Sequence, residues 1–163
     1  MSTTFAPGLV DPRLAFPHLA SRTRDGVLSE IAALVAEAGA VPDADALAER
    51  LRKRERDGCT GVGQGVAFPH CRLEGLRDVV VAVGLAPQGI DFGAPDGMPI
   101  TVLFLLLSPR DAAALHLQAL ARLTRLARTP GLVDELRHAD SAEGIVRALR
   151  EAESAGAAAA VGA

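Results

Sequence analysis

Two histidines stand in surroundings that favour nucleophilic or anion-binding chemistry. His70 follows Phe68 and Pro69, and the proline restricts the backbone that carries the imidazole. His116 lies four residues before Leu120 on the apolar side of a predicted helix, about two turns from an N-terminus that attracts anions. Neutral imidazole is nucleophilic at physiological pH. A structural role, with the ring hydrogen-bonded inside the core, is the alternative for both histidines.

Arg54 is a candidate anion ligand. It follows Leu51 by three positions and Leu47 by seven, which places it near the edge of a buried helix face; Arg50 is close to the same arc. A guanidinium in that position needs a compensating anion. Either an ion pair with a nearby carboxylate, Glu55 or Asp57, or a bound phosphoryl oxygen would supply one.

A glycine-rich segment, residues 58–65, precedes His70. Four glycines in eight residues indicate a tight backbone course. The run Gly61–Gly65 superficially resembles a phosphate loop, but no GK[ST] follows and the GxGxxG spacing is not met. A bulged hairpin that needs glycine is the simpler interpretation.

The two cysteines, taken together with His70 and His116, could suggest a zinc site, but they do not form a recognisable metal motif. Cys59 and Cys71 flank the glycine-rich segment, and their spacing matches neither CxxC nor HExxH. A thiol nucleophile paired with a histidine is conceivable, although Cys71, adjacent to His70, would point to the opposite face of a strand. His18 and His138 lie in polar stretches and are expected to be solvated. We therefore expect no metal.

The elements that must position these residues alternate between helical and strand patterns. An N-terminal arm or short edge strand precedes two amphipathic helices, and two continuous apolar runs, 79–86 and 100–107, indicate strands buried on both faces. A short strand is predicted over 89–92 between them, and three helices follow, the first capped by Asp111. The expected fold is a single α/β domain, a mixed β-sheet flanked by helices on both faces. Thr23 or Asp25 can cap the first helix, which runs through residues 27–39. The other helices and their stop signals lie at residues 43–58, 112–128, 132–138 and 141–152.

Length and composition exclude several classes of protein. The 163 residues suit one domain, assigned to residues 1–152, with a mobile tail over 153–163. A net charge of −3 with 3% aromatic residues argues against nucleic-acid binding. We see no signal peptide, and the longest apolar run is too short to span a membrane. The chain is expected to be cytoplasmic, without membrane insertion.

The run R-E-R-D-G-C-T-G-V-G-Q-G-V-A-F-P-H, residues 54–70, resembles a known signature. It is similar to R-E-x-x-G-S-T-G-I-G-x-G-I-A-I-P-H, typical of the type-2 (fructose/mannitol and nitrogen-regulatory) enzyme IIA proteins of the bacterial phosphoenolpyruvate-dependent sugar phosphotransferase system. The region 87–109 and the helix that carries His116 also resemble that family, so the similarity extends over about residues 8–152.

The resemblance implies a phosphohistidine intermediate. His70 would accept a phosphoryl group from the histidine-containing phosphocarrier protein and pass it to a cysteine of enzyme IIB for sugar uptake. His116 would stabilise the phosphoryl group, with Arg54 and Thr60 as further ligands, and neither metal nor cofactor would be needed. The alternative is a nitrogen-type regulatory protein whose phosphorylation state controls its partners.

Two residues depart from the family pattern. Cys59 replaces the usual serine and Cys71 stands where glycine is common. Neither change removes the phosphoryl acceptor, but together they raise the hypothesis of thiol-sensitive activity.

Overall fold

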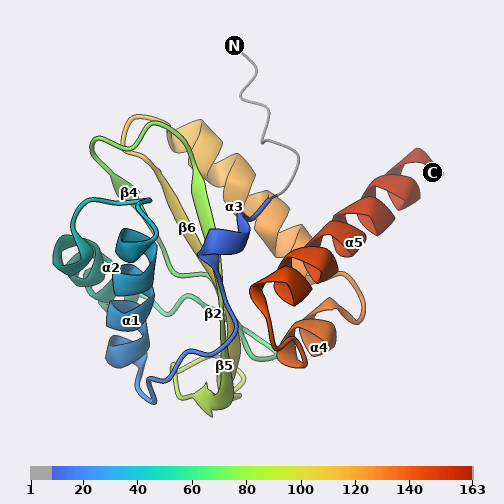
Figure 1. The fold of residues 1–163 in the computed structure, drawn as a ribbon, viewed down its shortest axis with the longest axis horizontal. Coiled ribbons are helices and arrows are strands. Elements are labelled where there is room, and N and C mark those ends of the chain that lie inside the picture. Colours follow the sequence, from blue (N-terminus) through green and yellow to red (C-terminus); the bar gives the residue numbers. More distant parts are fainter. Residues whose placement is uncertain (1–8, 163) are drawn as a thin grey trace.

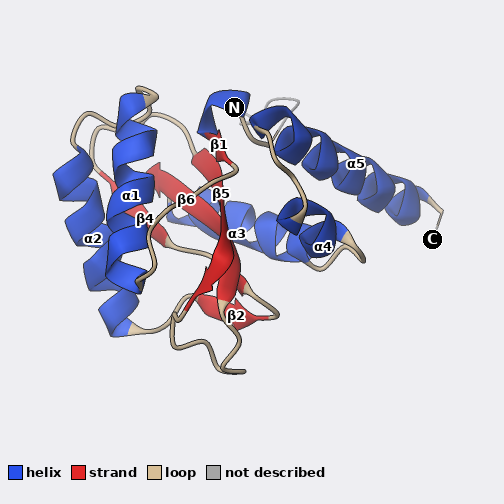
Figure 2. Cartoon of the chain, turned by 60° about the horizontal axis from the view of Figure 1, so that its bottom comes forward, coloured by secondary structure: helices blue, strands red, loops and turns tan. Residues whose placement is uncertain are grey.

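The computed structural model describes residues 9–162, and one mixed sheet of six strands forms its centre. Helices cover both faces of this sheet (Figures 1 and 2), which confirms the predicted fold class. The strands are β1 (Ala15–Phe16), β2 (Gly61–Gly63), β3 (Val66–Ala67), β4 (His70–Leu73), β5 (Val80–Ile90) and β6 (Ile100–Pro109). The helices are a 3₁₀ turn (Pro12–Leu14), α1 (Arg24–Glu37), α2 (Ala44–Asp57), α3 (Ala113–Ala127), α4 (Leu132–Arg137) and α5 (Ala142–Val161).

Strand β6 organises the sheet, whose order is β1-β5-β6-β3-β2. One edge of β6 pairs antiparallel with β5, and the other pairs parallel with β3 and then with β4. The break between β3 and β4 falls at Phe68 and Pro69, where the proline has no N–H to donate to a ladder. His70 therefore begins a new strand, in register with Leu106.

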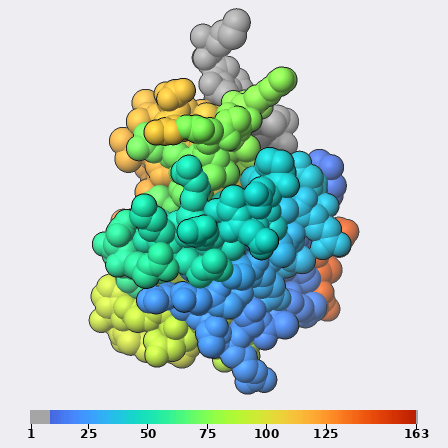
Figure 3. All heavy atoms as spheres, turned by 90° about the vertical axis from the view of Figure 1, so that its left-hand side faces the viewer, coloured from blue at the N-terminus to red at the C-terminus, as the bar shows by residue number. Residues whose placement is uncertain are grey.

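The two faces of β6 belong to two separate cores. Val102, Phe104 and Leu106 pack with the helices α3, α4 and α5. The residues between and after them pack with α1 and α2 on the opposite face, which Figure 3 shows from outside. Alternating side chains that are apolar on both faces explain why the run reads as continuously hydrophobic.

The first two helices begin where the sequence predicts. The Thr23 hydroxyl accepts the Gly26 N–H at 3.0 Å to cap α1, and the Asp43 carboxylate accepts the Ala46 N–H at 3.0 Å to cap α2. Such caps satisfy N–H groups that have no partner within the helix. Helix α2 ends at Gly58 as expected, so its last turn delivers Arg54 beside the glycine-rich segment.

Three boundaries differ from the prediction. The separate strand expected over 89–92 is absent: Gly89 and Ile90 form the end of β5, which runs to Ile90 after an irregularity, and residues 91–92 lie beyond it. Asp111 does not cap α3, whose N-cap residue is Ala112 and makes no side-chain cap. Helix α5 continues to Val161 instead of ending near Ala152, because an alanine-rich segment has high helix propensity even without apolar patterning.

Helix α5 projects from the body of the molecule (Figure 1). The side chains of residues 154–162 are exposed, so the predicted mobility of this segment stays a prediction. Residues 1–8 and 163, which belong to the predicted domain and tail, lie outside the described residues. No helix among the described residues combines the length and apolar character needed to cross a bilayer.

Candidate functional site

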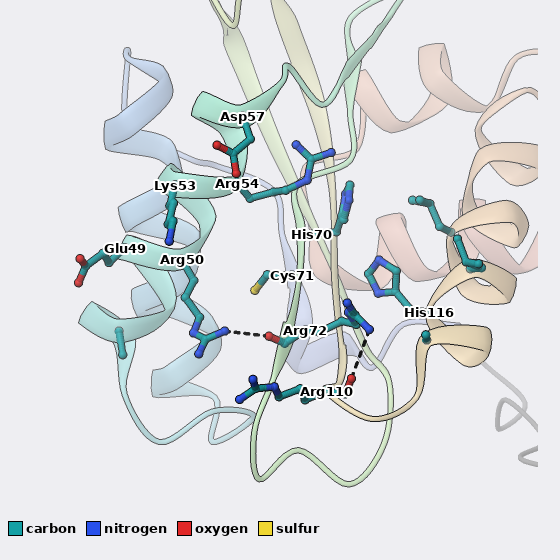
Figure 4. A pocket seen from close by; sticks show the side chains of 14 residues that line it. Glu49, Arg50, Lys53, Arg54, Asp57, His70, Cys71, Arg72, Arg110 and His116 are labelled. Atoms are coloured by element: carbon teal, nitrogen blue, oxygen red, sulfur yellow. Dashed lines mark hydrogen bonds between the residues drawn. The ribbon is translucent and has the colours of Figure 1, made fainter.

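A cavity of about 980 Å³ lies where α2, β4 and the N-terminal part of α3 meet. His70 and His116 both line this His70 cavity, with ring centroids 5.3 Å apart and ring planes inclined by 52° (Figure 4). The structure thus brings together two histidines that are 46 positions apart in the sequence.

A single hydrogen bond determines the tautomer of His70. Its Nδ1 lies 2.7 Å from the Phe68 carbonyl oxygen. Because a carbonyl oxygen can only accept, Nδ1 carries the proton. Phe68 is itself held firmly, since its ring is buried and stacks on Phe104 with centroids 5.5 Å apart. The lone pair therefore resides on Nε2, the nitrogen available for nucleophilic attack.

The surroundings of His70 favour its neutral form. Burial lowers the pKa of His70, and the nearby positive charge of Arg54 lowers it further. The hydrogen bond to Phe68 and the charge of Glu55 act in the opposite direction without reversing the shift. A neutral imidazole with a free lone pair is the reactive state of a histidine nucleophile.

His116 is oriented by Ser108, a residue that the sequence patterns did not indicate as functional. The Ser108 hydroxyl lies 2.8 Å from His116 Nδ1, and Ser108 is fully buried near the end of β6. Its only signal in the sequence is a serine that ends a run of apolar residues. Burial lowers the pKa of His116, and the charge of His70 lowers it further.

The direction of the Ser108–His116 hydrogen bond follows from what each group can satisfy. Among the described residues the Ser108 hydroxyl has no hydrogen-bond partner other than His116. If His116 Nδ1 carried a proton, the buried hydroxyl proton would have no acceptor, at a cost of about 1–3 kcal/mol. The hydroxyl therefore donates to Nδ1, and the proton of the neutral ring resides on Nε2. His116 can then act as a hydrogen-bond donor.

Arg54 also lines the cavity. Its guanidinium donates to the Gly58 carbonyl oxygen at 2.9 Å and points toward His70 (Figure 4). The described residues provide it with no ion pair, neither from Glu55 nor from Asp57. Its charge is thus available to an anion at His70.

Thr60 is not among the residues that line the cavity. It is buried, and its hydroxyl and N–H both donate to the Glu55 carboxylate, at 2.6 and 2.7 Å. This pair connects the end of α2 to the start of the glycine-rich segment. The sequence did not predict that Glu55 accepts hydrogen bonds from Thr60, because the two residues are five positions apart and on different sides of the end of α2.

The cysteine thiols do not have the character of nucleophiles. Cys71 lines the cavity, but burial raises its pKa to about 11, and burial also raises the pKa of Cys59. Both thiols stay protonated at neutral pH, which weakens the hypothesis of thiol-sensitive activity.

The other two histidines lie away from the site. His18 and His138 are exposed, as predicted, and neither lines the cavity. Within residues 9–162, no three side chains of histidine, cysteine, aspartate or glutamate form a group that could hold a metal ion.

Similarity to known proteins agrees with this geometry. The family described as "Phosphoenolpyruvate-dependent sugar phosphotransferase system, EIIA 2" matches residues 8–152. The chain is 38% identical over 141 residues to a nitrogen regulatory protein of Bradyrhizobium diazoefficiens, covering 86% of the chain and 92% of that protein. It is 33% identical to the PTS system fructose-specific EIIA component of Haloferax volcanii, and the match covers 79% of this chain and 84% of that protein.

Solved structures share the fold. Nitrogen regulatory protein IIA-Ntr from Neisseria meningitidis superimposes with a TM-score of 0.78 at 28% identity, over 86% of this chain and 95% of that one. Mannitol enzyme IIA of Escherichia coli, solved in complex with phosphorylated enzyme IIB, superimposes with a TM-score of 0.70 at 16% identity. The match covers 86% of this chain and 96% of that one, and at this identity it shows that the two proteins share a fold. This chain therefore belongs to the type-2 EIIA family of the phosphoenolpyruvate-dependent sugar phosphotransferase system.

Proposed function

We propose that the protein is a phosphocarrier whose acceptor atom is Nε2 of His70. The observation that carries this proposal is the 2.7 Å hydrogen bond from His70 Nδ1 to the Phe68 carbonyl oxygen. It leaves the lone pair on Nε2, in a cavity that also contains Arg54 and His116.

The transfer is an in-line displacement at phosphorus. As the Nε2–P bond forms, the P–N bond of the phosphorylated carrier protein breaks and its electron pair stays on the carrier's nitrogen. The His70 ring becomes positively charged, and the Phe68 carbonyl stabilises that charge through the Nδ1 proton. The same charge makes His70 a good leaving group for onward transfer.

Two side chains stabilise the phosphoryl oxygens in this proposal. Arg54 contributes a guanidinium without a carboxylate partner, and His116 contributes its Nε2 proton. Thr60 acts indirectly: its hydroxyl donates to Glu55, which supports the turn between Arg54 and the glycine-rich segment. Fixed donors of this kind lower the barrier because they need no reorganisation during transfer.

For the route, we propose transfer from the histidine-containing phosphocarrier protein to a cysteine of enzyme IIB, in the cytoplasm, for sugar uptake. The similarity to a fructose-specific EIIA component and the fold shared with mannitol enzyme IIA, solved with phosphorylated enzyme IIB, support this route.

A regulatory role is the second candidate. The similarity to nitrogen regulatory proteins of Bradyrhizobium diazoefficiens and Neisseria meningitidis favours it. In that role the charge state of the His70 cavity would control the binding of partner proteins.

Reconstitution separates the two routes. The protein is incubated with phosphoenolpyruvate, enzyme I and the phosphocarrier protein, and candidate enzyme IIB proteins are then added. Transfer to a fructose- or mannitol-type IIB supports sugar uptake. Stable phosphorylation without transfer to any IIB supports regulation, and no phosphorylation at all contradicts both.

A further inference from the structure

The His70 cavity contains several cationic side chains besides Arg54. Five cationic side chains line it, against the carboxylates of Glu49 and Asp57. The excess is positive in a chain whose net charge is −3, so the charge is concentrated here. The five cations are Arg50, Lys53, Arg54, Arg72 and Arg110.

Three of these arginines form a row, in which neutral acceptors orient the guanidinium groups of two, Arg50 and Arg72. Arg50 donates to the Arg72 carbonyl oxygen at 3.2 Å, and Arg72 donates to the Arg110 carbonyl oxygen at 3.3 Å (Figure 4). A carbonyl orients a guanidinium without cancelling its charge, and each guanidinium keeps further N–H donors. Arg110 alone of the three has a carboxylate partner within residues 9–162, namely Glu74.

The arginine row extends beyond the phosphoryl site. Arg54 points toward His70, whereas Arg50 and Arg110 lie at the opposite end of the cavity (Figure 4). All three members of the row, Arg50, Arg72 and Arg110, are exposed. Arg72 holds its guanidinium beside His116 (Figure 4). Arg50 and Arg110 are therefore the members of the row that are placed to meet anionic groups other than the phosphoryl group on His70.

Apart from His116, the wall of the cavity that α3 forms is apolar. Helix α3 contributes Ala113, Leu117 and Leu120 to it, and Leu117 is 66% exposed. A small free anion would gain nothing from an exposed leucine, whereas protein interfaces combine an apolar contact with a charged rim. A basic row beside an apolar wall thus fits a protein surface.

We propose that the protein that exchanges phosphoryl groups with His70 docks through an acidic surface. Carboxylates beside its reactive residue contact the row Arg50–Arg72–Arg110, and an apolar side chain packs on Leu117. This inference rests on the proposed function and adds the charge of the partner to it. Opposite charges steer the encounter and increase the rate of association, most strongly at low salt.

The test compares two phosphoryl donors. Second-order rates of His70 phosphorylation are measured with the phosphorylated carrier protein and with phosphoramidate, a small donor without a protein surface, between 50 and 300 mM NaCl. The test variant is Arg50→Glu/Arg72→Glu. Its control is Arg147→Glu/Arg150→Glu, which makes the same change of net charge at exposed positions of α5.

We expect the wild-type rate with the carrier to fall about tenfold over this salt range, because screening shortens the reach of exposed charges. The test variant is expected to lower the rate with the carrier about tenfold more than the rate with phosphoramidate. The control variant is expected to change neither rate. A carrier rate insensitive to salt, or an equal loss in the control, overturns the inference. If the test variant loses the same fraction of its rate with both donors, the inference is also overturned, because the row would then bind a small anion and not a protein surface. Absence of phosphorylation by either donor contradicts the proposed function instead.

Discussion

At the scale of single residues, the site depends on which ring nitrogen carries each proton. Two oxygen atoms decide this: the Phe68 carbonyl at His70 Nδ1 and the Ser108 hydroxyl at His116 Nδ1. In both histidines Nε2 is then the nitrogen that is available to a ligand. In His70 it carries a lone pair, and in His116 it carries a proton that can be donated. In the proposed transfer, His70 attacks phosphorus and His116 binds its oxygens.

The titration of His70 tests whether its ring is neutral and able to attack phosphorus. Burial and Arg54 lower its pKa, so we expect a midpoint below about 6.5, the ordinary value, in an NMR titration. Phosphoryl acceptance then remains fast at pH 6.5 and declines below it, as the ring becomes protonated. Arg54→Met is expected to raise the midpoint only in part, because burial is the larger cause. A midpoint at or above 6.5 contradicts this description.

The same shift predicts how stability depends on pH. A histidine whose pKa is lowered by folding binds its proton more readily in the unfolded chain. His70 and His116 both have lowered pKa values, so the free energy of unfolding is expected to decrease as the pH falls below about 6.5. Urea unfolding at pH 7.5 and 5.5 measures this, and His70→Gln/His116→Gln is expected to weaken the dependence. Equal dependence in that variant would refute the assignment.

Substitution of Ser108 tests the proposed position of the proton on His116. Ser108→Ala removes the donor to His116 Nδ1, so the His116 proton is no longer restricted to Nε2. We expect the rate of phosphoryl transfer to fall about tenfold, equivalent to about 1.4 kcal/mol. Nitrogen-15 NMR of His116 is expected to show a mixture of tautomers, and Ser108→Thr to restore one. An unchanged tautomer in Ser108→Ala would exclude this role.

At the scale of elements, strand and helix patterns in the sequence predicted most of what positions the site. The apolar run of β6 and the stripe of α2 are visible because burial imposes their periodicity. The pairing of Ser108 with His116 is not visible in this way, since it depends on how α3 returns over β6. The missing cap at Asp111 shows the same limit, because packing sets where α3 begins. The spacing from Leu47 and Leu51 was enough to select Arg54, whereas proposing His70 as the phosphoryl acceptor required the family signature.

The contact between Glu55 and Thr60 is the element-scale feature most open to testing. Thr60→Val removes one of two hydrogen bonds to a buried carboxylate. We expect the free energy of unfolding in urea to decrease by about 2 kcal/mol. Thr60→Ser, which keeps the hydroxyl, is expected to lose less than half of that. Equal stability of the two variants would show that the hydroxyl contributes little.

At the scale of the whole molecule, the body of the fold ends within α5 rather than at its terminus. Glu153 forms an ion pair with Arg122 of α3 and is half-buried, whereas residues 154–162 are exposed. The sequence-based boundary at residue 152 therefore falls one residue before a contact that joins two helices.

Two truncations test this boundary. Removal of residues 155–163 is expected to change the free energy of unfolding by less than about 0.5 kcal/mol, as for other surface changes. Removal of residues 153–163 also deletes Glu153 and is expected to cost up to about 1 kcal/mol more. Urea unfolding of both proteins measures the difference. A large loss from the shorter truncation would show that the exposed turns of α5 contribute to the fold.

The central claim concerns one nitrogen atom, and phosphate labelling tests it directly. The wild type, His70→Ala and His138→Ala are incubated with radiolabelled phosphoenolpyruvate, enzyme I and the phosphocarrier protein. We predict labelling of the wild type and of His138→Ala, an exposed histidine outside the site, with the phosphoryl group on His70 Nε2 by NMR. His70→Ala is predicted to take up none. Equal labelling of a correctly folded His70→Ala protein would contradict the account.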